Sequence, residues 1–467
     1  MPEGKLRREL GLRDVTLFAI ACIVGTRWIP AAAHAGPGSI TLWLAAAVFL
    51  VIPLAVAVAA LTVKYPGAGG LYLWTRGDFG PWHAFLAFWV YWVGIAFWFP
   101  SAAMFYMSVG LDTLAPPGAH WGENRLYLIA VSLIAIWVAL GTNLVGMKIG
   151  KWTENLGAAC AWVLGAILVA VAVLAWKHHG SATPMRLAPT WHWSTINFWS
   201  TIAYAMTGLE MAGMMGGEIH NPERTLPRAG WIASAFVTLF YVATTVSVLV
   251  LLRPDAISEL NGLAQAAQSA GRVTGMAWLI PLLAVLVLAS AVGQFGGMGT
   301  SVSRLPFAAS ADGLLPAAFG RVHPRWQTPH VSIVAFGILS SFLLVAAQLG
   351  DTLRAAYQAL VSLMVIAGLL PFVYLFGSAW KAGKRISAVS GWAVTVIAIV
   401  CSTVPTEEIT NVWLFETKLV LGTAAMILSA WLIYGWQTKW GRARSARGFS
   451  RTSDLPQTEP APQIDLV

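Results

Sequence analysis

Long apolar segments recur along the whole chain, and they restrict its fold more than any other feature. A helix needs roughly 20 mainly apolar residues to cross the hydrocarbon core of a bilayer. The 467 residues are 57% apolar and only 10% charged, far from the balance of a soluble domain. We therefore predict an all-α membrane protein with twelve transmembrane helices. Their expected ranges are 15–34, 40–63, 84–111, 126–146, 156–176, 196–215, 231–252, 276–297, 331–349, 355–377, 389–404 and 413–434.

Lysine and arginine are unevenly distributed among the segments that connect these helices. With a cytoplasmic N-terminus, the internal segments hold roughly three times as many of the 29 Lys and Arg residues as the external ones. This bias predicts a multi-pass protein of the inner (plasma) membrane with both termini in the cytoplasm. The first apolar run lacks a small-residue cleavage site, so we expect no cleaved signal peptide. The net charge of +9 follows from this topology and does not indicate nucleic-acid binding.

The sequence lacks the motifs of the common membrane-bound enzymes and metalloproteins. Cys22, Cys160 and Cys401 lie one each in distant predicted helices, without metal-ligand spacing or a disulfide framework. There is no phosphate-binding loop, HExxH or GxSxG motif. We expect neither a cofactor nor a metal, and we do not expect an enzyme.

The first predicted helix is interrupted near its middle. Gly25 and Pro30 weaken the helix, and Arg27 places a fixed charge between them. Unwound backbone offers free N–H and C=O groups at membrane depth, where transporters form substrate sites. A Pro kink with Arg27 extending to the interface is the alternative. We favour the substrate site, because charges within a membrane usually line a functional cavity.

The sixth predicted helix contains a second interruption, where Gly208 is followed by the ionisable Glu210. Glu210 could instead hydrogen-bond neighbouring helices as a purely structural contact. The two interruptions fall one in each half of a ten-helix core, which is the layout of inverted-repeat transporters. Their positions predict that they form a binding site together.

Five segments together resemble the amino acid–polyamine–organocation (APC) permease superfamily, over the chain from about Gly11 to the tenth predicted helix. They are the helix 1 stretch Gly-Thr-Arg-Trp-Ile at 25–29, the Lys-Tyr-Pro-Gly-Ala-Gly-Gly-Leu-Tyr loop at 64–72, Gly-Leu-Glu at 208–210, the Asn-Pro-Glu-Arg-Thr-Leu-Pro loop at 221–227 and Ala-Asp-Gly-Leu-Leu-Pro at 311–316.

The resemblance implies a five-plus-five inverted repeat with broken helices 1 and 6, followed by two peripheral helices. The corresponding domains are a cytoplasmic N-terminus at 1–14, the transport core at 15–377, the peripheral helices at 378–440 and a disordered cytoplasmic tail at 441–467.

The resemblance also implies that the substrate's carboxylate and amine bind at the unwound centres of helices 1 and 6, and that Glu210 serves proton coupling. The substrate-binding residues that it implies are Val24, Gly25, Thr26, Arg27, Trp28, Trp98, Tyr204, Thr207, Gly208 and Met298. Met298 falls where the arginine/agmatine antiporter has a gating aromatic, so the same substrate is not implied.

This chain departs from the superfamily pattern at two positions. Arg27 replaces the second Gly of the helix 1 motif, and Gly157 falls where proton-coupled relatives carry a Lys. Arg27 either braces the helix 1 break in place of that Lys or binds a substrate carboxylate. The segment from Trp89 to Trp92 also resembles the glutamate/GABA antiporter branch.

The sequence thus predicts a permease or exchanger of amino acids or related amines that works by alternating access. A carboxylate-binding Arg27 would favour acidic or carboxylate-bearing substrates. The expected partners are a small-molecule substrate, the lipid bilayer and, for proton symport, protons. The alternatives are a polyamine or amine exchanger, a non-transporting substrate sensor on the same fold, and a channel, which the broken helices disfavour.

Overall fold

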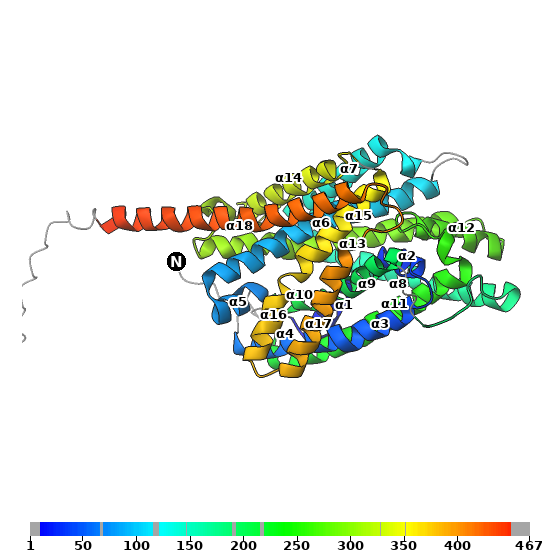
Figure 1. The fold of residues 1–467 in the computed structure, drawn as a ribbon, viewed down its shortest axis with the longest axis horizontal. Coiled ribbons are helices and arrows are strands. Elements are labelled where there is room, and N and C mark those ends of the chain that lie inside the picture. The colour runs from blue at the N-terminus through cyan, green and yellow to red at the C-terminus, as the bar shows by residue number, and fades with distance from the viewer. Residues whose placement is uncertain are drawn as a thin grey trace, which may run out of the picture.

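The computed structural model describes residues 10–65, 69–114, 121–145, 147–188, 193–214, 219–326, 328–350 and 352–449. Within these ranges the chain is helical and forms no strand, apart from an isolated parallel bridge between Leu10 and Ile219. Parts of the expected termini (1–9 and 450–467), part of the motif loop at 64–72 (66–68) and the segment 215–218 at the end of the sixth expected helix lie outside the described residues. The long helices run side by side along one common direction (Figure 1).

The helices of the N-terminal half are α1 (Leu12–Ile23), α2 (Trp28–His34), α3 (Ser39–Ala46), the π-helical turn η1 (Ala47–Val51), α4 (Ile52–Lys64), α5 (Leu71–Phe79), α6 (Pro81–Leu114), α7 (Arg125–Val145), α8 (Met147–His179), α9 (Trp193–Ala205) and α10 (Leu209–Met214). Those of the C-terminal half are α11 (Pro222–Leu251), α12 (Gly262–Thr274), α13 (Leu279–Ala311), α14 (His330–Ala347), α15 (Leu353–Leu369), α16 (Phe372–Lys381), α17 (Arg385–Ser402) and α18 (Val412–Phe449).

The described residues contain ten helical segments that are long and apolar enough to cross a membrane. The pair α1 and α2, bent by 51° at its break, would make eleven. The remaining expected span, 196–215, corresponds to α9 and α10, which have 13 and 6 residues. Neither is long enough to cross by itself, because a crossing needs roughly 20 residues.

Several helices differ in detail from the expected ranges. The second expected helix comprises α3, η1 and α4, so a π-helical turn interrupts it in the middle. The tenth divides into α15 and α16 next to Pro371, which has no N–H to continue the helical ladder. The short helices α5 and α12 were not expected, because neither carries a run long enough to cross a membrane.

The helices differ strongly in burial. In the most apolar 18-residue windows of the α6 segment and the α15–α16 segment, 89% and 83% of the residues are buried. The corresponding shares are only 28% for α7 and 17% for α18. The centre of the bundle is therefore formed around α6 and α15, while α7 and α18 expose apolar surface as membrane-facing helices do. α18 continues to Phe449, beyond the expected end of the last span.

Candidate substrate site at two helix breaks

The break between α1 and α2 spans residues 24–27, and side chains of other helices bond its backbone. The Gly25 N–H donates to Tyr241 Oη at 2.8 Å, and the Tyr241 hydroxyl donates to the Ile23 carbonyl at 2.7 Å. The side-chain amide of Gln294 donates to the Val24 carbonyl. Backbone groups freed within a membrane need such partners, because hydrocarbon offers none. α11 and α13 therefore stabilise the unwound segment.

Gly25 is required by the packing of its neighbour. A Cβ atom at this position would lie 2.6 Å from Trp28 Nε1, so a larger residue would displace the Trp28 ring.

The Thr26 hydroxyl lies 3.4 Å from both Tyr106 Oη and Ser290 Oγ, and Tyr106 in turn donates to Gln294 Oε1 at 2.7 Å. A neutral hydrogen-bond network thus connects the break to α6 and α13.

Arg27 is the largest charged side chain that lies in the interior of the described structure, with only 1% of its surface exposed. Its Nη1 donates to Ser101 Oγ at 2.8 Å and its Nη2 to Met364 Sδ at 2.9 Å. Its Nε has no hydrogen-bond partner among the residues that the structure describes. In the described part of the chain, no carboxylate lies within ion-pair distance of the guanidinium. Because a thioether is a weak acceptor, the charge is poorly compensated.

Two tryptophan rings lie against this guanidinium. Arg27 Cζ is 3.9 Å from the centre of the Trp28 ring and 5.2 Å from that of Trp98. Such contacts are attractive, and more so away from water, but they do not neutralise the charge. Trp28 also meets Tyr204 edge to face at 5.9 Å. These rings connect the helix 1 break with the second break.

The break between α9 and α10 depends on Gly208, whose φ of +124° is a conformation that other residues rarely adopt. A Cβ atom here would also lie 3.1 Å from Ile23 Cγ1 and 3.3 Å from the Cys22 carbonyl carbon. The two breaks therefore touch. Tight turns at the end of α9 leave Thr207 donating from both its N–H and its hydroxyl to the Tyr204 carbonyl.

Glu210 lies at the start of α10 and is 1% exposed. Its Oε2 accepts from the Gly208 N–H and its Oε1 accepts from the Tyr91 hydroxyl, each at 2.9 Å. Within the described chain, this carboxylate forms no ion pair. Both of its partners are neutral hydrogen-bond donors. An ionised carboxylate accepts both bonds, whereas a protonated one uses one oxygen as a donor and can lose one of them.

A small cavity of about 20 Å³ lies where the two breaks meet. This volume holds about one water molecule and not an amino acid, so the structure is a closed form in which aromatic side chains fill the site. The sequence-predicted residues that line it are Trp28, Trp98, Tyr204, Thr207, Gly208, Glu210 and Met298.

The other predicted site residues lie beside this cavity. Val24 lines a neighbouring cavity of about 10 Å³ together with Gly157 and Gln294. Arg27 lies behind the rings of Trp28 and Trp98, outside the cavity wall. At Gly157 a Cβ atom would lie 2.4 Å from Gly293 Cα, so the packing of α8 on α13 leaves no space for a side chain.

Sequence reasoning did not find several residues that hold the site together. They are Tyr91, Ser101, Tyr106, Tyr241, Gln294 and Met364. Their partners lie up to 337 positions away, and polar residues scattered over apolar helices give no local signal of such contacts. The one available signal was the presence of tyrosine and glutamine within apolar segments, because a polar group inside a membrane needs a hydrogen-bond partner.

The geometry agrees with what similarity to known proteins shows. The model of the amino acid permease family matches residues 10–435. The chain belongs to this family. As a member of the APC superfamily, it is a multi-pass membrane transporter, which confirms the family expected from the sequence motifs.

Three relatives illustrate the range of this permease family. An uncharacterised transporter of Legionella pneumophila is 24% identical over 91% of this chain and 96% of its own length. A probable agmatine/putrescine antiporter of Lactococcus lactis is 24% identical over 80% of this chain and 81% of its own. A branched-chain amino acid permease of Bacillus subtilis is 26% identical over 73% and 75%. Family and relatives together support a transporter of amino acids or amines.

Proposed function

We propose that this permease is a secondary active transporter that works by alternating access and that its substrate bears a carboxylate which pairs with Arg27. The observation that carries the proposal is the buried guanidinium next to the helix 1 break, with one unpartnered N–H and no carboxylate partner among the described residues. An unpaired charge inside a membrane is costly. A substrate carboxylate would supply the missing partner.

The charge at the second break supports an amino acid as the substrate. Glu210 lines the cavity and has only neutral partners, so it suits an amine or a proton. Rotation of Trp28 and Tyr204 out of their edge-to-face contact would join the Arg27 side to the cavity. The enlarged site would offer a cation at one end and a carboxylate at the other, which matches a zwitterion.

The same proposal includes the finer architecture of the fold. α1 with α2 and α9 with α10 would be the broken helices 1 and 6 of a five-plus-five repeat, making twelve spans, with α17 and α18 as the peripheral pair. The contact of Gly208 with Cys22 and Ile23 supports this pairing of the breaks. The core would cover 15–377 and the peripheral helices 378–440.

Both termini are proposed to lie in the cytoplasm of a cell with the protein in its inner membrane, on the distribution of Lys and Arg. Single cysteines introduced in the segments 64–81, 218–229 and 304–329 should then resist a membrane-impermeant thiol reagent applied from outside. Rapid labelling in several of these segments would contradict this orientation.

A second candidate function is the exchange of polyamines or related amines. It is favoured by the buried Glu210 on the cavity wall and by the similarity to a protein named a probable agmatine/putrescine antiporter. A cationic substrate without a carboxylate would leave Arg27 unpaired, so we rank it below a carboxylate-bearing substrate.

Counterflow into proteoliposomes tests these proposals directly. Vesicles preloaded with glutamate, a neutral amino acid, agmatine or putrescine would be challenged with the labelled form of the same compound. We expect saturable counterflow with a carboxylate-bearing compound. Counterflow with putrescine and agmatine alone would favour the amine exchanger, and binding without flux would indicate a sensor.

A further inference from the structure

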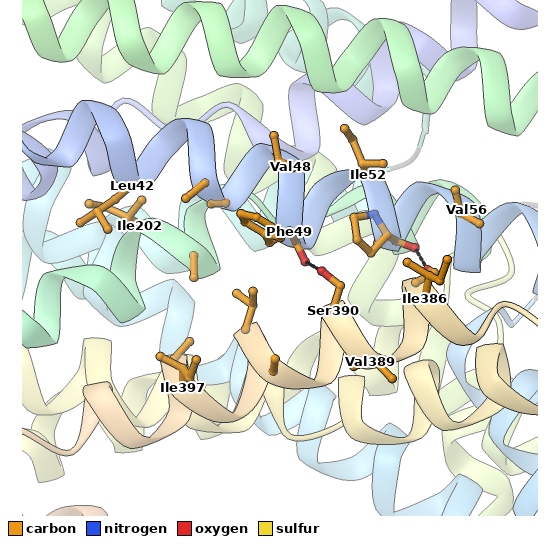
Figure 2. A pocket seen from close by; sticks show the side chains of 18 of the residues that line it. Leu42, Val48, Phe49, Ile52, Val56, Ile202, Ile386, Val389, Ser390 and Ile397 are labelled. Atoms are coloured by element: carbon orange, nitrogen blue, oxygen red, sulfur yellow. Dashed lines mark hydrogen bonds between the residues drawn. The ribbon is translucent and has the colours of Figure 1, made fainter. Parts of the chain in front are cut away.

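A second, larger cavity on the described part of the molecule shares no lining residue with the cavity at the breaks. It is a groove of about 1170 Å³ between the α3–η1–α4 segment and α17, closed at one end by α9. Figure 2 shows Val48, Phe49 and Ile52 on one of these segments and Val389, Ser390 and Ile397 on the other, with Phe49 and Ser390 turned toward each other. Its walls are almost entirely apolar. Both walls belong to segments long and apolar enough to span the membrane.

The two walls are fixed relative to each other by hydrogen bonds. Ser390 Oγ donates to the Phe49 carbonyl at 2.7 Å, and Ser387 Oγ donates to the Pro53 carbonyl. Phe49 belongs to the π-helical turn η1, whose wider winding changes the direction of its carbonyls. The groove is therefore a defined feature of the fold and not an accidental gap between loosely packed helices.

The groove is open toward the membrane. Ile386 is 89% exposed in the isolated protein, and Phe49 is 55% exposed. Its lining on α17 runs from Arg385 to Cys401, a length of roughly 24 Å at 1.5 Å per residue. This exceeds half of the roughly 30 Å hydrocarbon core. The groove can therefore hold an extended acyl chain over the whole depth of one leaflet.

One end of the groove carries basic residues. Arg385 lines this end, and a second hollow of about 560 Å³, which shares Val56 with the groove, is lined by Lys384 and Lys64. Lys64 is paired with Asp78 at 2.8 Å. Among the described residues neither Lys384 nor Arg385 has a carboxylate partner, although Glu223 also lines the second hollow. The two unpaired cations outnumber this single carboxylate.

Two exposed tryptophans mark the level of this basic end. Trp380 lines the groove and Trp231 lines the second hollow. Tryptophans are enriched where a membrane protein crosses from hydrocarbon to headgroups. The cations therefore lie where lipid phosphates lie, and the apolar groove extends from them into the hydrocarbon.

We propose that this groove is a binding site for one anionic phospholipid, with an acyl chain along α17 and the headgroup phosphate at Lys384 and Arg385. A long apolar groove with a basic end between membrane helices matches the shape and charge of such a lipid. The proposal is independent of the substrate site, because none of its residues lines the cavity at the breaks.

A second copy of this chain fits the same face less well. Two copies in one membrane with the same orientation are related by a two-fold axis along the membrane normal, so equal depths meet. Such a dimer would bring Lys384 and Arg385 of one copy to the level of the same cations in the other. A phosphate neutralises these charges, whereas a second copy would double them.

Native mass spectrometry of the full-length protein in detergent tests the proposal. The probes are phosphatidylglycerol and phosphatidylcholine with identical acyl chains. Wild-type protein should retain one phosphatidylglycerol at least about tenfold more strongly than phosphatidylcholine, since each basic residue near a headgroup contributes about fivefold. The double variant Lys384→Gln with Arg385→Gln should reduce this preference to about threefold or less.

Two further variants separate charge from shape. Ala393 lies on the exposed wall of the groove, so Ala393→Trp fills it and should weaken retention of both lipids. If that variant fails to fold, Ala393→Phe serves the same purpose. Lys439 is an exposed cation at the end of the α18 span and lines neither hollow, so Lys439→Gln is the matched control and should leave retention unchanged.

Equal retention of the two lipids by the wild-type protein would overturn the proposal. It would equally be overturned by an unchanged preference in the double variant, by unchanged retention in the filled-groove variant, or by a dimer that forms through this face and excludes lipid.

Discussion

The two helix breaks solve the same structural problem by opposite means. The break between α1 and α2 is stabilised from outside, by the side chains of Tyr241 and Gln294 from other helices. The break between α9 and α10 is stabilised mainly from within: Gly208 adopts a positive φ, and Glu210 accepts from the backbone two residues earlier, while Tyr91 adds one bond to Glu210 from α6. The first break should therefore respond to changes in distant helices, and the second to changes in its own sequence.

The breaks also carry opposite charges with different compensation. Within the described residues Arg27 has two neutral partners, one of them a weak thioether acceptor, and an unsatisfied N–H, whereas Glu210 accepts one hydrogen bond on each oxygen. A charge that is poorly satisfied in the closed form gains most from a ligand. On this comparison, we expect the Arg27 side to govern substrate affinity and the Glu210 side to govern the proton dependence.

The largest effect is expected for Arg27. Arg27→Ala should lower counterflow at low substrate concentration by about 100-fold, because losing one partner of a buried charge pair costs about 2–5 kcal/mol. Arg27→Lys keeps the charge but not the planar fork, and should raise the apparent KM by about tenfold. Unchanged KM in Arg27→Lys with near-normal transport would make Arg27 a brace of the break. Wild-type kinetics in Arg27→Ala would exclude both roles.

Gly208→Ala tests whether the second break depends on its own backbone. With φ at +124° and Ile23 Cγ1 3.1 Å from the new Cβ, the substitution should destabilise the protein by about 1–3 kcal/mol. Thermal unfolding in detergent measures this. Gly141→Ala is the matched control, since a Cβ there meets no atom within 4 Å. Equal melting temperatures for the two variants would contradict the strain at Gly208.

Glu210→Gln tests the division of roles between the breaks. Glutamine keeps the size of the side chain but cannot take up a proton, so the pH dependence of transport should flatten. The variant should remain folded, because its amide oxygen can still accept from Gly208 or Tyr91. The same pH profile as wild type would leave Glu210 with a structural role only.

Glu259 provides a buried carboxyl away from both breaks for comparison. It is 2% exposed and accepts from Gln358 Nε2 at 2.7 Å. The charged and titratable groups near Glu259 are Glu408 and Tyr357, and Glu408 in turn lies near Arg354 and His34. Burial, followed by the charge of Glu408, raises the pKa of Glu259 well above its ordinary value of 4.5. The pKa of Glu408 is raised as well, mainly by burial.

A raised pKa in the folded state fixes the sign of the pH effect. The contribution of protonated Glu259 to the free energy of unfolding is fully present below its ordinary pKa of 4.5. It is lost as the pH rises through the raised pKa of the folded state. Glu259→Gln should remove this pH dependence of stability. At pH values above the folded-state pKa, it should raise the melting temperature by a few degrees. The pH profile of transport should stay as in wild type. A flattened transport profile in this variant would mean that Glu210 is not the group responsible.

Local chemistry made much of the fold and part of the site predictable. Runs of apolar residues identify membrane helices because hydrocarbon requires each segment to satisfy its own backbone. Gly25 and Gly208, each close to a charged residue, marked the breaks, since glycine relaxes the backbone and charges are rare and costly inside a membrane. The motif residues Trp28, Tyr204, Thr207 and Met298 do line one cavity. Their roles in binding stay predictions.

Sequence alone did not locate the short helix α12, the π-helical turn η1 or the partners of the two charges. α12 has 13 residues and lies outside the apolar runs. Ser101 and Met364 contact Arg27 from positions 74 and 337 residues away. Their polarity and size are unremarkable along their own helices. Only the rotation of α6 and α15 about their axes directs them to the guanidinium.

The sequence by itself determined that the chain crosses a membrane repeatedly, that two of its helices break, and which charges lie at the breaks. These properties depend on the energy of each residue in hydrocarbon, which is local. Tertiary structure alone decided that Arg27 is without a carboxylate partner among the described residues, that the cavity is closed, and that α4 and α17 leave a groove. In a membrane, lipid-facing and buried faces of a helix are both mainly apolar, so sequence patterns do not reveal which faces meet. Helix packing decides that.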